Sequence, residues 1–220
     1  PEQGRRITVS QLSAALRRGG RRRNLRHRAE EISKALRSPQ LEAPKVLAGA
    51  YAVSVRALVA VLQEISTQIE ELERELERSF RSHPDAEIYL SLPGLGDVLG
   101  ARALGEFGDD RTRYADARSR KAYAGTAPIT KASGTKRIVL ARFARNEHLA
   151  DACHLWAFAA LLRSPGARRY YDGLRSRGKT NNQALRQLAN RLVGILHVCL
   201  ERGELYREEV AWPEPEEVAA

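Results

Sequence analysis

The chain has 220 residues, 43% of them hydrophobic and 29% charged, and its formal net charge is +10 at pH 7. This composition supplies enough apolar material for one or two packed domains and excludes an intrinsically disordered polymer. Of the 37 basic residues, 31 are arginines, whose planar guanidinium groups bind phosphate through two parallel hydrogen bonds. The charge therefore predicts a phosphate-rich partner.

The sequence carries no sign of export. No uncharged run reaches the roughly 18 residues of a membrane span, and the chain does not open with a signal peptide, so we predict a cytoplasmic protein without a membrane partner. Two cysteines, Cys153 and Cys199, are too few for a disulfide framework. The chain begins with Pro1 and contains no Met, which predicts a piece of a longer protein.

Charge is distributed along the chain in blocks of one sign. Residues 1–28 hold nine arginines and one acid, residues 111–145 hold ten bases and one acid, and residues 163–191 hold eight bases and one acid. Residues 29–110 hold 15 acids and 8 bases, and the last twenty residues hold seven Glu and two Arg. We interpret the two central basic blocks as nucleic-acid contacts and the acidic tail as a solvated surface.

The first predicted elements are two short helices over residues 7–17 and 25–36, separated by Gly19-Gly20. A long helix follows. Its apolar residues alternate steps of four and three, the 3.5-residue period of a coiled coil: Leu58, Leu62, Ile65, Ile69, Leu72 and Leu76. The pattern predicts self-association through this helix, and the alternative is an amphipathic helix that packs within the chain.

Further helices are predicted over residues 148–162 and along a later apolar stripe that runs from Leu185 to Cys199. Residues 128–143 are not helical in pattern, and Ser133-Gly134-Thr135 at their centre predicts an extended loop or a hairpin. The predicted fold is mostly α. It comprises a basic linker (1–45), a coiled-coil helix (46–82), a compact helical domain (83–212) and an acidic tail (213–220).

The turn Leu92-Pro93-Gly94-Leu95-Gly96 precedes an apolar helix. Two glycines at this spacing allow a tight turn, and their backbone N–H groups at a helix start are free to meet a phosphate oxygen. The pattern is typical of the hairpin in a helix-hairpin-helix DNA-binding element. An ordinary turn is the alternative.

Ser133 lies in the segment KASGTKR, residues 131–137. A serine hydroxyl on a glycine-containing turn, surrounded by cations, has the groups needed to attack a phosphodiester. From the residues alone, an ordinary loop serine is the better interpretation. Tyr170-Tyr171 is a weaker alternative nucleophile.

No metal site is predicted within this chain. Asp109-Asp110 are neighbours at the end of an element, and the other acids lie in the long helix and the tail, so no carboxylate cluster for Mg²⁺ stands out. The set Cys153, His154, His197 and Cys199 contains zinc-ligand types, but adjacent residues of a helix point to different sides. Buried packing is the preferred interpretation of this set.

Several ordered motifs share a common resemblance. They include SLPGLG (91–96), GEFGDD (105–110), KAYAGTAPIT (121–130), ASG (132–134), WAFAAL (156–161), SPGAR (164–168), YYD (170–172) and NRLVGILH (190–197). Together, over residues 85–212, they closely resemble the carboxy-terminal transposase domain of the IS110/IS116/IS902 insertion-sequence family in its actinobacterial form.

The resemblance implies a DNA recombinase of an insertion element that is guided by a bridge RNA. It implies an amino-terminal RuvC-like domain that binds Mg²⁺ through four acids, a coiled-coil connector, and a domain that supplies a serine nucleophile. Ser133 matches that serine. The expected partners are DNA, a guide RNA and a second copy of the chain, at the bacterial nucleoid. The expected nucleic-acid-binding residues are Gly94, Gly96, Lys131, Gly134, Lys136, Arg137, Arg142 and Arg145.

Two features depart from the family pattern. Many members continue after the serine with Lys-Arg-Gly-Asn, whereas this chain has Arg142-Phe143-Ala144-Arg145-Asn146 and so keeps only the Asn. The RuvC-like domain is not in this chain, so we expect the chain alone to bind nucleic acid but not to recombine it. The competing hypothesis is a non-catalytic nucleic-acid-binding module in which Ser133 is structural.

Overall fold

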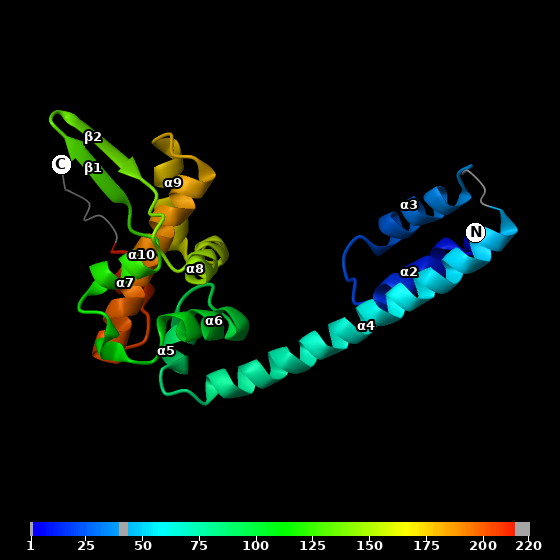
Figure 1. Ribbon diagram of the computed structural model, residues 1–220, viewed down its shortest axis with the longest axis horizontal. Coiled ribbons are helices and arrows are strands. Elements are labelled where there is room, and N and C mark those ends of the chain that lie inside the picture. Colours follow the sequence, from blue (N-terminus) through cyan, green and yellow to red (C-terminus); the bar gives the residue numbers. More distant parts are fainter. Residues whose placement is uncertain (1, 40–43, 214–220) are drawn as a thin grey trace. The chain divides into compact units, whose positions relative to one another are not determined.

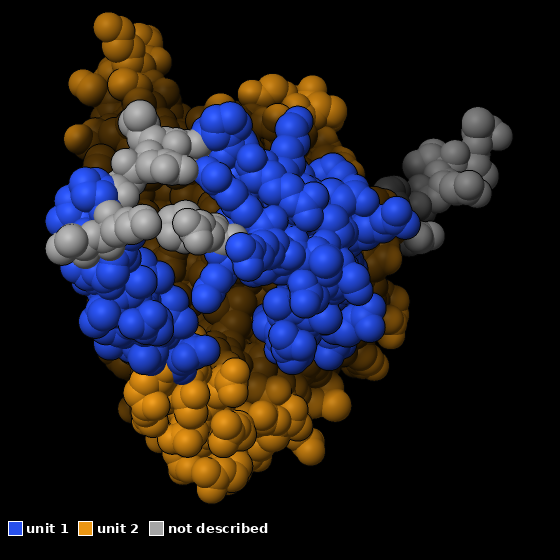
Figure 2. Space-filling model, turned by 90° about the vertical axis from the view of Figure 1, so that its right-hand side faces the viewer, with its two compact units in different colours: residues 1–63 blue, residues 64–220 orange. Residues whose placement is uncertain are grey.

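The computed structural model describes residues 2–39 and 44–213, which form helices and one two-stranded sheet (Figure 1). The chain divides into two compact units, residues 1–63 and 64–220, coloured separately in Figure 2. The predicted mostly α fold with a single hairpin is confirmed. The division falls inside a long helix, and the predicted boundaries at residues 45, 82 and 212 stay predictions. Except for Pro213, the predicted acidic tail lies outside the described residues.

The first unit contains α1 (Glu2–Arg6), α2 (Val9–Arg18) and α3 (Leu25–Arg37). A capping box starts α2, because the Thr8 hydroxyl accepts from the Gln11 N–H while the Gln11 side chain accepts from the Thr8 N–H. Gly20, with a φ of +82°, turns the chain toward α3. Ala29 and Ser33 are the buried residues of α3. The two helices predicted here are confirmed.

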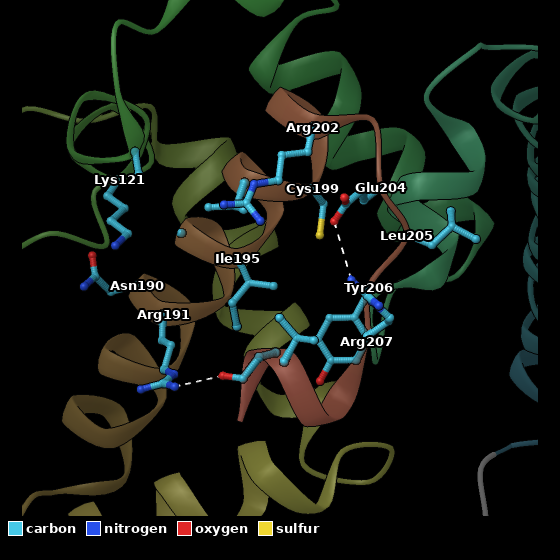
Figure 3. A pocket seen from close by; sticks show the side chains of 15 residues that line it. Lys121, Asn190, Arg191, Ile195, Cys199, Arg202, Glu204, Leu205, Tyr206 and Arg207 are labelled. Atoms are coloured by element: carbon cyan, nitrogen blue, oxygen red, sulfur yellow. Dashed lines mark hydrogen bonds and ion pairs between the residues drawn. The ribbon is translucent and has the colours of Figure 1, made fainter. Parts of the chain in front are cut away.

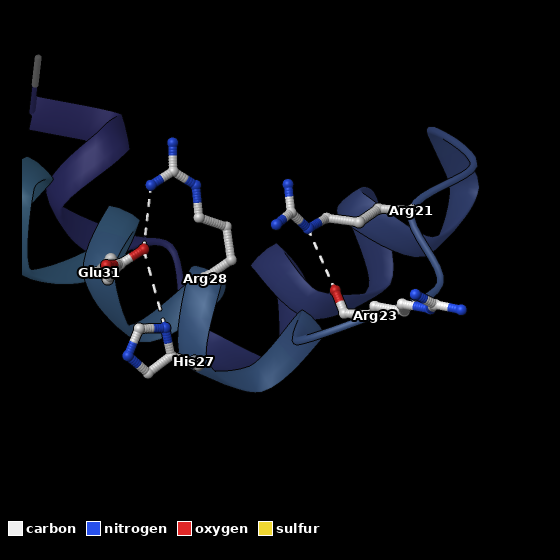
Figure 4. A network of polar contacts seen from close by, with 5 residues as sticks. All are labelled: Arg21, Arg23, His27, Arg28 and Glu31. Carbon is white, nitrogen blue, oxygen red and sulfur yellow. Dashed lines mark hydrogen bonds and ion pairs between the residues drawn. The ribbon is translucent and has the colours of Figure 1, made fainter. Parts of the chain in front are cut away.

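Acids of α3 partly neutralise the arginines of this unit. Arg28 donates to Glu31 at 3.0 Å, and His27 lies 3.9 Å from the same carboxylate (Figure 4). The hydrogen bond from Arg28 lowers the pKa of Glu31. Arg21 donates instead to the backbone carbonyl of Arg23, whose own guanidinium points away from this network. Arg21, Arg22 and Arg23, which are all exposed, add positive charge in the connection between α2 and α3.

The helix α4 (Lys45–Arg81) is 37 residues long, which corresponds to roughly 55 Å at 1.5 Å per residue. The six apolar residues of the predicted seam lie along it, and their exposed fractions run from 40% for Leu76 to 69% for Leu72. The structure confirms a long helix with an apolar stripe. The residues of this stripe are exposed, and self-association through it stays a prediction.

The residues Leu47–Arg81 of α4 are also long and apolar enough, by length and composition, to be a candidate membrane span, and none of their most apolar stretch is buried. This evidence is weak, because seven of the nine residues from Glu70 to Arg78 are charged and charges are costly in lipid. The absence of a membrane partner stays a prediction.

The second unit begins with the end of α4, whose Phe80 is buried in its core. It continues through α5 (Ala86–Ser91), α6 (Asp97–Phe107), the 3₁₀ turn η1 (Arg111–Arg113), α7 (Ala117–Tyr123), β1 (Ile129–Ser133), β2 (Lys136–Leu140), α8 (Glu147–Ala160), α9 (Pro165–Ser176), α10 (Asn181–Arg202) and α11 (Glu208–Ala211).

The centre of this unit is formed by α8 and α10. Leu149, Cys153, Trp156 and Ala160 of α8 are buried, as are Leu188 and Leu192 of α10. These positions repeat every three or four residues, so each helix turns one apolar stripe inward. A capping box at Thr180 starts α10, and Gly203 in the left-handed conformation ends it. Both helices predicted in this region are confirmed.

The carboxy-terminal helix α11 is held against this core. Arg191 of α10 donates to the Ala211 carbonyl at 2.8 Å (Figure 3), and its guanidinium lies 4.4 Å from the ring centroid of Trp212. The carboxylate of Glu208 accepts from the Ser164 hydroxyl and the Gly166 N–H at 2.9 and 2.7 Å. These contacts join α11 to the start of α9.

Candidate active site and nucleic-acid interface

Ser133 lies at the tip of an antiparallel hairpin formed by β1 and β2. It pairs with Lys136 across a two-residue turn, Gly134-Thr135. Gly134 has a φ of +54° and Thr135 does not have a positive φ, the pattern of a type II′ turn, whose twist matches that of the two strands. The predicted extended segment is therefore a hairpin, and glycine is required at its tip.

The strand register sorts the predicted site residues onto two faces. Directly opposed residues of an antiparallel pair share a face, and successive residues alternate. Ser133, Lys136 and Lys131 share one face, whereas Arg137 pairs with Ala132 on the other. All of these residues are exposed. The structure thus brings two of the predicted cations to the Ser133 face and turns Arg137 away from it.

The hairpin also exposes apolar side chains. Ile138 and Val139 are 54% and 60% exposed on opposite faces of β2. An isolated two-stranded hairpin is marginally stable in water, and such hairpins are usually stabilised by packing on another surface. Among the described residues, these two apolar side chains stay largely exposed on both faces of the hairpin.

The loop after β2 positions the start of α8. Asn146 caps this helix by accepting from the Leu149 N–H at 3.0 Å. Its side-chain amide donates to Glu106 of α6 at 2.6 Å and to the Tyr123 hydroxyl of α7 at 3.3 Å. The one residue that this segment shares with the family pattern is therefore a structural junction between three helices. The cap was recognisable in the sequence as an Asn before an apolar helix.

The other two predicted residues of this loop have different environments. The Nε atom of Arg142 is buried without a hydrogen-bond partner among the described residues. Arg145 is exposed, and its side chain lies so close over Gly125 that a Cβ there would come within 2.3 Å of the Arg145 Cδ atom. The binding roles of both residues stay predictions.

The predicted turn at Gly94 and Gly96 does connect two helices, α5 and α6. Gly94 has a φ of +86°, and a Cβ there would lie 2.5 Å from the Ala160 backbone nitrogen of α8. The Trp156 indole donates to the Pro93 carbonyl at 2.9 Å. Gly94 is therefore needed for close packing on α8. Gly96 is exposed and precedes α6 without a side-chain cap, and phosphate contact by either glycine stays a prediction.

The first half of the basic block 111–145 is largely engaged in packing. Arg111 pairs with the buried Asp85, and Arg113 donates to the Phe107 carbonyl and the Tyr123 hydroxyl at 3.1 Å each. Arg120 is only 2% exposed. The interpretation of this whole block as nucleic-acid contact is wrong for Arg120, because a buried guanidinium cannot meet a phosphate.

Arg120 instead lies over two aromatic rings, 4.7 Å from the centroid of Tyr114 and 5.2 Å from that of Phe107. Its Nε and Nη1 atoms have no hydrogen-bond partner among the described residues. Burial lowers the pKa of this guanidinium and raises that of the neighbouring Tyr89. The sequence pattern did not indicate this packing role of Arg120. The aromatic residues near Arg120 in the chain were the available signal.

The alternative nucleophiles Tyr170 and Tyr171 have structural partners. The Tyr170 ring lies 5.6 Å from that of Trp212 and 5.5 Å from the Arg191 guanidinium. The Tyr171 hydroxyl donates to Asn181 at 2.7 Å. Both contacts tie α9 to neighbouring segments.

The cysteine and histidine set is not brought together as a metal site. Cys153 and Cys199 are buried and free, and burial raises the pKa of Cys153 to about 12. In the described ranges, no group of three or more His, Cys, Asp or Glu side chains could hold a metal ion. The Mg²⁺ implied by the resemblance therefore finds no fitting group of ligands here.

Comparison with known proteins gives one family and several relatives. Residues 86–172 match the family described as Transposase IS116/IS110/IS902. The IS117 mini-circle protein of Streptomyces coelicolor is 42% identical over 96% of this chain and 51% of its own length. An uncharacterized 43.6 kDa protein of insertion element IS110 from the same species is 34% identical over 90% of this chain and 51% of its own. An uncharacterized 42 kDa protein of IS900 from Mycobacterium paratuberculosis is 35% identical over 70% of this chain and 39% of its own length. The chain spans about half the length of these relatives or less.

Proposed function

We propose that this chain is the part of a DNA recombinase that binds DNA and supplies the serine nucleophile, because its residues 86–172 match the transposase family IS116/IS110/IS902. The observation that supports this proposal is the arrangement of side chains at the hairpin tip. There, an exposed Ser133 hydroxyl shares a face with Lys131 and Lys136. An exposed tip can approach a DNA backbone, whereas a buried serine cannot.

In the proposed step the Ser133 oxygen attacks a backbone phosphorus, forms a serine–phosphate ester and displaces the oxygen of one strand end. Negative charge builds up on the phosphoryl oxygens, and the ammonium groups of Lys131 and Lys136, which share the hairpin face of Ser133, stabilise it. A neutral hydroxyl is a weak nucleophile, so its proton passes to a base. The leaving oxygen takes up a proton.

We propose that the base and the Mg²⁺ come from a RuvC-like domain, since the described residues offer no fitting metal ligands. When bound there, the metal would make the attacking oxygen more acidic and stabilise charge on the phosphate. We further propose that a guide RNA occupies part of the basic surface and that the complete protein acts at the nucleoid in the cytoplasm.

The experiment uses the full-length protein with Mg²⁺, guide RNA and labelled substrate DNA, and it measures the covalent protein–DNA adduct. Ser133→Ala is expected to abolish the adduct and to change DNA affinity by less than about twofold, because no charge is lost. The control is Thr135→Ala, which removes the other hydroxyl of the same turn and should leave the adduct. An adduct that persists in Ser133→Ala would overturn the assignment and direct attention to Tyr170 and Tyr171.

A second candidate function is a non-catalytic nucleic-acid-binding module. It is favoured by the exposed cations of the hairpin, Lys131, Lys136 and Arg137, which can bind a phosphate without any chemistry at Ser133. In that case Ser133→Ala leaves recombination by the full-length protein unchanged, whereas neutralising Lys131 and Lys136 weakens it.

We also propose that α4 pairs with α4 of a second copy, because its apolar seam is exposed along the helix. Ile65→Lys combined with Ile69→Lys should give monomers by light scattering, since burial of such side chains contributes about 1.5–3 kcal/mol each. The control, Ala60→Lys with Thr67→Lys, adds the same charge on the opposite side of the helix. A wild-type chain that is monomeric by light scattering would contradict the proposal. Binding of the chain to lipid vesicles through α4, measured by flotation, would also contradict it.

A further inference from the structure

A polar cleft lies at the base of the hairpin, with a volume of about 370 Å³, which is within the range of small-ligand pockets. Four segments converge on it: the connection between α7 and β1, the loop before α8, the first half of α8, and the start of α10. Its polar lining residues are Thr126, Arg145, Glu147, Asp151, His154, Asn182 and Arg186.

The cleft joins the two basic blocks that are separate in the sequence. Arg145 comes from the first block and Arg186 from the second. Of the two acids in the lining, Asp151 is paired with Arg102 at 2.9 Å, so its charge is largely compensated. Glu147, the other acid, offsets one of the two arginines, so the cleft keeps one net positive charge, which suits an anionic group such as a phosphate.

An exposed aromatic residue, Phe143, lies two positions before Arg145, which lines this cleft. Phe143 is 84% exposed, more than any other large apolar side chain in the part of the chain that the structure describes. It precedes Arg145 by two residues, so its Cα lies within roughly 7 Å of the Arg145 Cα. A ring left in water beside a cationic cleft is the arrangement with which proteins stack unpaired bases while they hold the backbone.

We propose that this cleft binds an unpaired nucleotide of a single-stranded nucleic acid, with its phosphate between Arg145 and Arg186 and its base stacked on Phe143. Asn182 and His154 supply hydrogen-bonding groups for the sugar or the base edge. A duplex does not satisfy this site, because its bases are stacked on one another and present no free face. The inference rests on the proposed nucleic-acid-binding function and assigns a second site, apart from Ser133, to an unpaired strand.

The test measures fluorescence anisotropy of the complete 220-residue chain with labelled single-stranded RNA, single-stranded DNA and duplex DNA of the same sequence. Phe143→Leu keeps an apolar residue but removes the aromatic face. Single-strand affinity should fall 5- to 150-fold, the equivalent of about 1–3 kcal/mol per stacked base, with duplex affinity nearly unchanged. Phe143→Trp should retain single-strand binding. If Phe143→Leu lowers the affinity for single-stranded RNA more than that for single-stranded DNA, the strand is RNA, and the opposite result identifies DNA.

The phosphate contact is tested by Arg186→Ala. This variant should weaken single-strand binding and reduce the slope of log affinity against log salt by about 0.7, the value for one contact to a single strand. The control Arg202→Ala removes the same charge at the other end of α10 and should leave the slope nearly unchanged. Equal losses in the two arginine variants would overturn the site.

The outcomes separate this inference from the proposed function. A chain that binds no nucleic acid at all contradicts both. A chain that binds duplex DNA, and whose single-strand affinity is unchanged by Phe143→Leu, contradicts only the cleft. Phe143→Leu that weakens single-strand and duplex binding equally also contradicts it, because a base-stacking residue discriminates between them.

Discussion

The hairpin segment, residues 128–145, and the helical segment, residues 85–123, have similar signals in the sequence but opposite roles in the structure. Each combines a glycine turn with arginines or lysines, and each was predicted to contact nucleic acid. In the hairpin, Gly134 and Lys136 face solvent. In the helical segment, Gly94 packs on the backbone of α8 and Arg120 is buried on aromatic rings. Local charge and turn chemistry therefore do not predict whether a glycine or a cation is buried.

The largest effect is expected from adding one methyl group at each of the two glycines. Gly94→Ala should lower the free energy of unfolding by about 3–5 kcal/mol, because a strained positive φ adds to an overlap with the α8 backbone. Gly134→Ala should cost only about 1–2 kcal/mol, since only the strain applies and no atom lies within 4 Å of its Cβ. Urea unfolding measures the free energy of unfolding of both variants. Equal losses would contradict the difference between a packed Gly94 and a solvent-facing Gly134.

The next effect concerns the buried guanidinium. Arg120→Ala should destabilise the second unit by about 2–4 kcal/mol, because it leaves a cavity beside Tyr114 and Phe107. Arg120→Met keeps most of the volume and removes the unpartnered nitrogens, so it should recover at least half of the loss. Thermal unfolding by circular dichroism provides the measurement. A Met variant as unstable as the Ala variant would show that charge, not packing, holds this position.

A smaller effect on binding, with none on folding, is expected at the hairpin. Lys131→Gln with Lys136→Gln should leave the unfolding midpoint unchanged and reduce the salt slope of duplex binding by about 0.9 per lysine. Each single variant, Lys131→Gln or Lys136→Gln, is compared with Lys34→Gln on α3, which also removes one lysine charge. Loss of folding stability in the double variant would contradict the solvent-facing role of this hairpin face.

The smallest expected effect is a pH dependence at His197, beside the helical segment. Its Nδ1 is buried without a partner among the described residues, and burial, then Arg120 and Lys121, lowers its pKa, while Glu201 and Asp116 oppose the shift. A depressed pKa in the folded state means that the unfolded chain binds more protons just below pH 6.5, so stability falls as pH drops through that range. Urea midpoints at pH 7.5 and 5.5 should show a small loss that His197→Gln removes.

Part of the candidate site is predictable from the amino-acid sequence. The hairpin follows from an extended pattern around Ser133-Gly134-Thr135, since a two-residue turn with glycine at a positive φ is a local property. The packing roles of Cys153 and Cys199 follow from their places on apolar helix stripes. The cleft is not predictable in this way, because Arg145 and Arg186 are 41 positions apart in the chain and only the packing of α8 against α10 brings them together.

By itself, the sequence determined the long helix with its apolar seam, the helices over residues 7–17, 25–36, 148–162 and 185–199, and the non-helical segment around Ser133, because hydrophobic period and turn chemistry act within a few residues. The tertiary structure alone decided which cations meet solvent. It placed Arg120 inside and Arg137 on the far face of the hairpin, made Asn146 a junction of three helices, and gave Gly94 a packing role. The physical reason is that an arginine or a glycine fits several environments, and only the neighbours brought by long-range packing select one of them.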